Sequence, residues 1–221
     1  MANTENKPRV TIGVKRYTFF KVISDTAEGT EYGEPYLLEG TVQVSPTDSG
    51  GSDTFDADDG AYDVESYIEN IGHELTNADI PANVDMMWRG RELKNGVAEV
   101  GDVTDPPMFA VAWRISKIGN KHRYIRYYKG KYSFASNVGG KTKPSSGPSE
   151  KQTATATFTA VKRVSDGNYY AYIDEDDIPE GVSVEELEEK WFSDPNYYPV
   201  GTKSLNAAPK TAVAATTKKE G

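Results

Sequence analysis

The sequence predicts a mainly β protein, a β-sandwich or partly closed barrel with two short helices covering an open end or face. Three observations support this prediction. Apolar and polar residues alternate in many segments that are rich in β-branched and aromatic types. Turn formers are plentiful, with 20 Gly and 12 Pro, and the apolar fraction of 37% suits sheets with polar outer faces. The 221 residues are enough for one large core or two small ones.

In the first half of the chain, strands dominate. The predicted strands are residues 10–23, 37–44, 62–71 and 73–78. The stretch from Ser45 to Ala61 is crowded with turn formers and acids, so it fits either a long mobile loop or a hairpin that turns near residues 49–52. Residues 80–89 form the best interior helix candidate, because Pro81 suits an early helical position and the apolar residues recur at helical spacing.

The second half continues the strand pattern and ends in a less regular region. The predicted strands are residues 108–118, 123–134, 152–164 and 169–173, with turns at Asn95-Gly96, Gly119-Asn120 and Asp166-Gly167. Residues 174–180 are expected to be a turn, and the four acids at its start, residues 174–177, are expected to be exposed to solvent. Ser183 has the spacing of a helix cap. The chain therefore divides into a β domain (residues 1–175), a short helix with an irregular extension (176–202) and a flexible C-terminal tail (203–221).

Charge is sorted strongly along the chain. Residues 48–105 contain 15 Asp and Glu against 3 Lys and Arg, whereas residues 106–172 contain 2 acids against 12 bases. A subunit with one acidic and one basic face is suited to head-to-tail association, which closes into rings or grows into filaments. The alternative interpretation is that both segments are solvated strand faces whose signs alternate in space.

Composition and incomplete motifs argue against catalysis. The chain has no Cys and two His, and neither an enzyme nor a cofactor or metal site is expected. His73-Glu74 begins like a zinc-protease motif, but Asn77 stands where the second His belongs, so His73 is expected to be structural. The basic, Tyr-rich stretch 114–131 fits either a nucleic-acid surface or a sheet that faces a partner subunit. Residues 1–10 are polar and no stretch approaches 18 apolar residues, so a soluble protein made in a cytoplasm is expected.

Six segments occur in an informative order: GVKRYTFFKVISD (13–25), TFDADDGAYDVE (54–65), HELTNADIP (73–81), PPMFAVAWRIS (106–116), YIRYYKGKYS (124–133) and KTKPSSGPSEKQTATATFTAV (141–161). Together they resemble the major tail proteins, or tail tube proteins, of long-tailed phages (siphophages) of Gram-positive bacteria. The resemblance covers residues 10–175, so the region from Asp176 onward inherits no role.

The resemblance implies a structural virion protein of the phage tail, made in the host cytoplasm. In such proteins a tail-tube β domain assembles into hexameric rings, and each subunit adds strands to an inner barrel. The rings stack into a hollow tube that delivers DNA into the host, and the stretch from Ser45 to Gly60 would be an assembly loop or hairpin. The implied partners are further copies of the chain, the tape-measure, tail-terminator and distal-tail proteins, and genomic DNA that passes without specific binding. No membrane is involved.

An acidic lumen would let DNA slide, whereas a basic lumen would hold its phosphates. The lumen-facing candidates are Asp48, Asp53, Asp56, Asp58, Asp59 and Asp63. The alternative role of these acids is ion pairing between rings. The basic candidates for contacts between subunits or rings are Arg126, Lys129, Lys131, Lys141 and Lys143.

A second hypothesis is a β-sandwich module that binds carbohydrate at a phage or cell surface. It depends on the supply of aromatic residues, because sugars stack on exposed rings. The candidate rings are Trp88, Trp113, Tyr127, Tyr128, Tyr197 and Tyr198. Positions of Trp88 and Trp113 in the core would weaken this hypothesis.

Overall fold

The computed structural model describes residues 8–57, 60–102, 105–133, 139–148 and 150–201. Strands dominate this part of the chain and the helices are short, which confirms the mainly β fold class. The strands are β1 (Thr11–Asp25), β2 (Thr30–Leu38), β3 (Thr41–Pro46), β4 (Ser49–Ala57), β5 (Gly60–Asn70), β6 (Gly72–Asn77), β7 (Phe109–Lys117), β8 (Lys121–Ser133), β9 (Ala154–Ala160) and β10 (Tyr170–Asp174). The helices are α1 (Ala82–Trp88), the 3-10 turn η1 (Glu175–Asp177) and α2 (Val184–Trp191).

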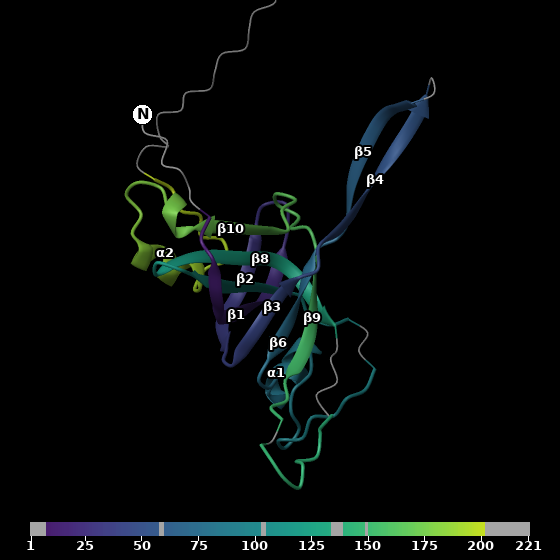
Figure 1. Cartoon of the computed structure of the whole chain (residues 1–221), viewed down its shortest axis with the longest axis vertical. Coiled ribbons are helices and arrows are strands. Elements are labelled where there is room, and N and C mark those ends of the chain that lie inside the picture. Colours follow the sequence, from purple (N-terminus) through teal and green to yellow (C-terminus); the bar gives the residue numbers. More distant parts are fainter. Residues whose placement is uncertain (1–7, 58–59, 103–104, 134–138, 149, 202–221) are drawn as a thin grey trace, which may run out of the picture.

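Most strands belong to one antiparallel sheet with the order β2-β1-β7-β8-β9-β6-β3, to which β10 adds by pairing with β8 (Figure 1). The sheet bends, so that β3 also lies close to β1. β2 and β3 end the strand order and do not pair with each other in the described residues, so the structure shows a bent open sheet. β4 and β5 form a separate hairpin that projects from the body of the molecule (Figure 1).

The long strand β8 has two neighbours along one edge. Its residues 123–127 pair with β10 and its residues 130–133 pair with β9, while β7 pairs along the other edge. Gly130 lies where β9 approaches most closely. A Cβ atom at Gly130 would lie 2.4 Å from the Phe158 ring and 2.4 Å from the Thr159 carbonyl oxygen. A glycine is therefore required here by the close approach of another backbone.

The substitution Gly130→Ala is expected to lower the free energy of unfolding by about 2 kcal/mol, because a methyl group forced into a filled space displaces both strands. Urea denaturation followed by fluorescence measures the change. Gly139→Ala is the control, since a Cβ atom there meets nothing within 4 Å. Equal unfolding midpoints for the two variants would contradict the steric explanation.

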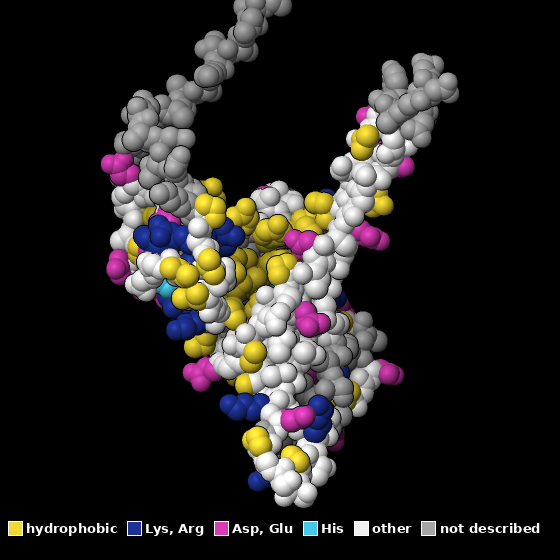
Figure 2. All heavy atoms as spheres, in the orientation of Figure 1, with side chains coloured by type: hydrophobic (Ala, Val, Ile, Leu, Met, Phe, Trp, Pro, Cys, Tyr) yellow, Lys and Arg dark blue, Asp and Glu magenta, His cyan; other side chains and the backbone are white. Residues whose placement is uncertain are grey.

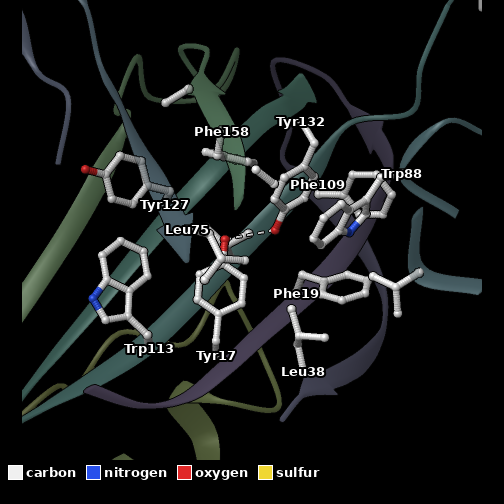
Figure 3. Close-up of a cluster of buried hydrophobic side chains, with 14 of the residues drawn as sticks. Tyr17, Phe19, Leu38, Leu75, Trp88, Phe109, Trp113, Tyr127, Tyr132 and Phe158 are labelled. Carbon is white, nitrogen blue, oxygen red and sulfur yellow. Dashed lines mark hydrogen bonds between the residues drawn. The ribbon is translucent and has the colours of Figure 1, made fainter. Parts of the chain in front are cut away.

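The main core lies on one face of the sheet, where side chains of alternate residues point inward (Figure 3). Its large members are Tyr17, Phe19, Leu38, Leu75, Trp88, Phe109, Trp113, Tyr127, Tyr132 and Phe158. The opposite face carries a second cluster, in which Phe20, Ala110, Ala112 and Tyr124 contact Leu187, Trp191 and Phe192. Helix α2 therefore covers the outer face of β1, β7 and β8.

Both predicted helices are confirmed. Helix α1 begins after Pro81, and the ring of Trp88 at its end stacks on Tyr132 with 3.9 Å between centroids. Helix α2 begins after Ser183, whose hydroxyl accepts a hydrogen bond from the Glu186 backbone N–H at 3.0 Å. This cap satisfies one of the free N–H groups of the first turn.

Three predicted boundaries are wrong. The strand predicted over residues 37–44 is two strands, because Gly40 adopts a φ of 83° and redirects the chain between β2 and β3. The strand predicted over residues 152–164 is limited to β9. The hairpin does not turn near residues 49–52, since β4 starts there. Gly50 instead permits a close strand contact, because a Cβ atom would lie 2.5 Å from the Tyr67 carbonyl oxygen.

Candidate self-association surfaces

The β4–β5 hairpin exposes most of its described side chains. Residues 63–70 are all exposed, and the apolar residues Val64, Tyr67 and Ile68 are 56%, 55% and 65% exposed. An isolated two-stranded ribbon is marginally stable in water. The exposed apolar side chains make this ribbon a candidate interaction surface.

The strand register gives the hairpin two different faces. Asp53 of β4 lies directly opposite Glu65 of β5. Because side chains alternate along a strand, Val64 and Ile68 lie on the other face. The acidic hairpin face consists of Asp53, Asp63, Glu65 and Tyr67. Acidic side chains are visible along the hairpin in Figure 2.

Asp53 and Glu65 form a like-charge pair across the hairpin, which destabilises an isolated ribbon. No cation in the described residues forms an ion pair with either carboxylate. The Tyr67 ring lies over Gly51, where a Cβ atom would be 2.5 Å from the Tyr67 hydroxyl oxygen. The glycine therefore leaves room for the Tyr67 ring to lie across β4 beside these acids.

The predicted lumen-facing acids lie in two places. Asp53 and Asp63 lie on the acidic hairpin face, whereas Asp48 lies at the base of the hairpin and accepts a hydrogen bond from the Gly72 backbone N–H at 3.2 Å. The side chains of Asp56, Asp58 and Asp59 lie outside the described residues. Their position relative to a lumen stays a prediction.

Two of the basic candidates are buried within the chain, which corrects their expected position. Arg126 is 1% exposed, and its guanidinium donates to the carbonyl oxygens of Asp194 at 3.0 Å and Tyr197 at 2.7 Å. Lys129 Nζ lies 2.5 Å from Asp25 Oδ2. Burial alone would raise the pKa of Asp25. The hydrogen bonds that its carboxylate accepts, the strongest of them from Lys129, outweigh burial, so the pKa is lowered. These cations join segments of one chain and are not available to a neighbour.

The other three basic candidates remain at the surface. Lys131 pairs with Asp105 at 2.8 Å, and Lys141 pairs with Glu150 at 3.1 Å. Lys143 is exposed and forms no ion pair with a described residue. Their role between subunits stays a prediction.

A cationic surface that the charge sorting did not reveal lies on β1 and β7. Lys15 lies directly opposite Arg114. Arg16 and Arg114 both donate to the same oxygen of Glu188, each at 2.7 Å, so one carboxylate serves two guanidinium groups. Lys15 is exposed and has no ion pair among the described residues. The cationic strand face consists of Lys15, Arg16 and Arg114.

Another like-charge pair is neutralised within the chain. Lys117 lies opposite Lys121, but Lys117 pairs with Asp174 at 2.5 Å and Lys121 pairs with Glu175 at 3.1 Å. Arg123 also pairs with Asp174. The hydrogen bond from Arg123 is the main reason that the pKa of the Asp174 carboxyl is lowered to about 2. The prediction of a solvated turn beginning at Asp174 is therefore wrong, since these acids form a partly buried ion-pair network.

His73 lies in the aromatic core, in agreement with a structural role. Its Nε2 atom is 2.7 Å from the Tyr17 hydroxyl oxygen, which is 3.0 Å from that of Tyr132. Burial lowers the pKa of His73 to about 3, so the ring is neutral near pH 7. The described residues include no group of three or more His, Cys, Asp or Glu that is arranged to hold a metal ion.

Four of the six candidate rings for sugar binding are buried. Those buried in the protein are Trp88, Trp113, Tyr127 and Tyr128. Tyr198 is 73% exposed and Tyr197 is half-buried, so of these six rings Tyr198 alone is largely accessible. The four buried rings do not support the carbohydrate hypothesis, whereas Tyr198 lines a pocket together with Tyr170 and Tyr172, and the hypothesis stays a prediction.

Comparisons with known proteins identify no relative that has these surfaces. No family model matches the chain, and no match is found among the curated proteins. None of the helices in the described part of the chain combines the length and the apolar character needed to cross a membrane. The hairpin, the cationic strand face and the open sheet edges are the features of the described chain that bear on its function.

Proposed function

We propose that the chain is a structural virion protein, which self-assembles into stacked hexameric rings that form the hollow tail tube of a long-tailed phage. The observation that carries the proposal is the β4–β5 hairpin, which presents Val64, Tyr67 and Ile68 to solvent beyond the core. A ribbon of this kind gains stability when another copy covers it. The order of sequence segments that resembles tail tube proteins supports the same function.

The open edges of the sheet also suit assembly. In the described residues β10 pairs along one edge with β8, and β2 and β3 end the strand order. Unpaired edges are templates for strands of another chain, and a ring of subunits covers them by closing on itself. Each copy would then add strands to an inner barrel, as in the family that the sequence resembles.

A negatively charged lumen would support the passage of DNA without binding. Of the acidic candidates for the lumen wall, Asp53 and Asp63 lie on the exposed acidic hairpin face, where they either line the lumen or contact a neighbouring copy. Duplex DNA carries dense negative charge, and carboxylates repel it where lysines would retain it. The tape-measure, tail-terminator and distal-tail proteins are the further partners that the resemblance implies, and the assembled protein would be located in the virion tail.

Negative-stain electron microscopy of the concentrated full-length protein tests the proposal. Rings and stacked tubes are expected, and uniform monomers at every concentration would contradict it. A variant in which a short Gly-Ser turn replaces residues 51–67 should fold normally, because no residue of this stretch belongs to either core cluster of the described chain. This variant should form no tubes. Tubes formed by it would show that the hairpin is not the assembly element.

A further inference from the structure

We propose that the acidic hairpin face of one copy docks on the cationic strand face of a second copy. The inference rests on the proposed function and identifies the contact that joins the copies. It commits to a second copy of this chain as the partner, because both complementary surfaces are present on each subunit.

The first argument is that each surface contains a like-charge pair that the subunit leaves unneutralised or only partly neutralised, since Arg114 shares Glu188 with Arg16. Asp53 faces Glu65 across the hairpin, and Lys15 faces Arg114 across β1 and β7. Like charges directly opposite each other destabilise a sheet. Docking would place each pair against its opposite and remove both penalties at once.

The second argument is the contrast with the like-charge pair of Lys117 and Lys121. That pair receives two carboxylates from the same chain, Asp174 at 2.5 Å and Glu175 at 3.1 Å. The cationic strand face receives one carboxylate, Glu188, for two arginines and none for Lys15. Within the described chain the pair of Lys117 and Lys121 is thus neutralised internally, whereas the acidic hairpin face and the cationic strand face stay open to a neighbour.

The third argument is placement. Lys and Arg side chains gather on the side of the molecule that carries β1 and α2, whereas the hairpin leaves from the opposite side (Figures 1 and 2). A hairpin on one side and its acceptor on the other cannot meet within one subunit. They produce a head-to-tail contact, which repeats from copy to copy and generates a ring or a filament.

The fourth argument is the apolar chemistry beside the charges. The groove that contains Lys15 and Arg114 is also lined by Ile12, Gly13, Ser116, Lys117, Asn120 and His122. Ile12 is 65% exposed, and Tyr67 on the acidic hairpin face is 55% exposed. The groove thus offers an apolar contact for the tyrosine ring while the carboxylates meet Lys15 and Arg114. Charge then fixes the register of docking, and the ring adds buried area.

A charge exchange tests this contact. Glu65→Lys and Lys15→Glu change exposed side chains, so both variants should fold, as circular dichroism will verify. Alone, each should lower the assembled fraction in sedimentation velocity about tenfold at low salt, because attraction becomes repulsion. An equimolar mixture should recover assembly, since each altered hairpin meets an altered strand face and each native hairpin meets a native one. The chain with both substitutions should recover as well.

Two further variants sharpen the result. Lys21→Glu makes the same charge change at another exposed position of β1 and should assemble like the wild type. Lys143→Glu tests a different acceptor for the hairpin. If a mixture of Glu65→Lys and Lys143→Glu recovers assembly and a mixture of Glu65→Lys and Lys15→Glu does not, the inference is overturned. Wild-type assembly without recovery in the mixture would overturn the inference and leave the proposed function standing. A wild-type protein that stays monomeric would overturn both.

Discussion

The substitution Arg126→Met is expected to lower the free energy of unfolding by about 3 kcal/mol. The guanidinium is almost fully buried and donates to the carbonyl oxygens of Asp194 and Tyr197, and it lies 4.1 Å from the centre of the Trp191 ring. Methionine fills similar space but donates no hydrogen bond, so both carbonyl groups lose their charged partner. Urea unfolding followed by tryptophan fluorescence measures the loss.

The control for this prediction is Arg126→Lys. An ammonium group reaches fewer acceptors than the planar guanidinium and stacks less well on an aromatic ring, so an intermediate loss is expected. A Met variant within 0.5 kcal/mol of the wild type, as is usual for surface substitutions, would show that Arg126 does not hold the segment after α2 to the sheet.

The second large effect is a pH dependence caused by His73. Burial lowers its pKa from 6.5 to about 3 in the folded protein. Below pH 6.5 the imidazole therefore binds a proton in the unfolded chain but stays neutral in the folded chain. The free energy of unfolding is highest above pH 6.5 and decreases as the pH falls toward 3. Between pH 6.5 and 4.5 the loss should reach about 2 kcal/mol, at 1.4 kcal/mol for each pKa unit.

Comparison with His73→Phe isolates this effect. Phenylalanine keeps a flat ring between Trp113 and Phe158 and cannot bind a proton, although the Tyr17 hydroxyl loses one partner. The lost hydrogen bond changes the overall stability of the variant, so the measured quantity is the change in unfolding free energy with pH. The wild type should lose about 2 kcal/mol more than the variant over the same interval. Parallel pH profiles for the two proteins would contradict a buried neutral His73.

Much of the fold follows from local patterns. The alternation of Phe109, Val111 and Trp113 predicts a strand on which these side chains share one face, and all three lie in the main core. The cap at Ser183 and the helix after Pro81 were predicted for similar reasons, because capping and periodicity depend on neighbours within one or two turns.

Side chains on the second face of the sheet were harder to predict. Arg126 and Lys129 belong to a basic stretch that the sequence places at a subunit surface. Helix α2 and the segment after it cover Arg126, and Asp25 at the end of β1 reaches Lys129. Alternation shows that a strand has two faces, but it does not show whether a distant helix covers the second one.

The candidate site divides in the same way. The charge sorting along the chain predicts acidic and basic surfaces, and the acidic one is found on the hairpin at Asp53, Asp63 and Glu65. The charge sorting does not predict the cationic strand face, because Lys15 and Arg16 precede the basic segment of residues 106–172. Strand register brings Lys15 opposite Arg114, and register is set by contacts between distant segments.

The amino-acid sequence by itself determined that this is a mainly β protein, where most of its strands and both helices lie, and that its charges are separated. Those properties depend on neighbouring residues, whose spacing is the same in any fold. Only the tertiary structure decided which cations are buried and which face outward, where the hairpin turns, and which like charges stand opposite each other. These features depend on pairing and packing between segments far apart in the chain, which no local pattern encodes.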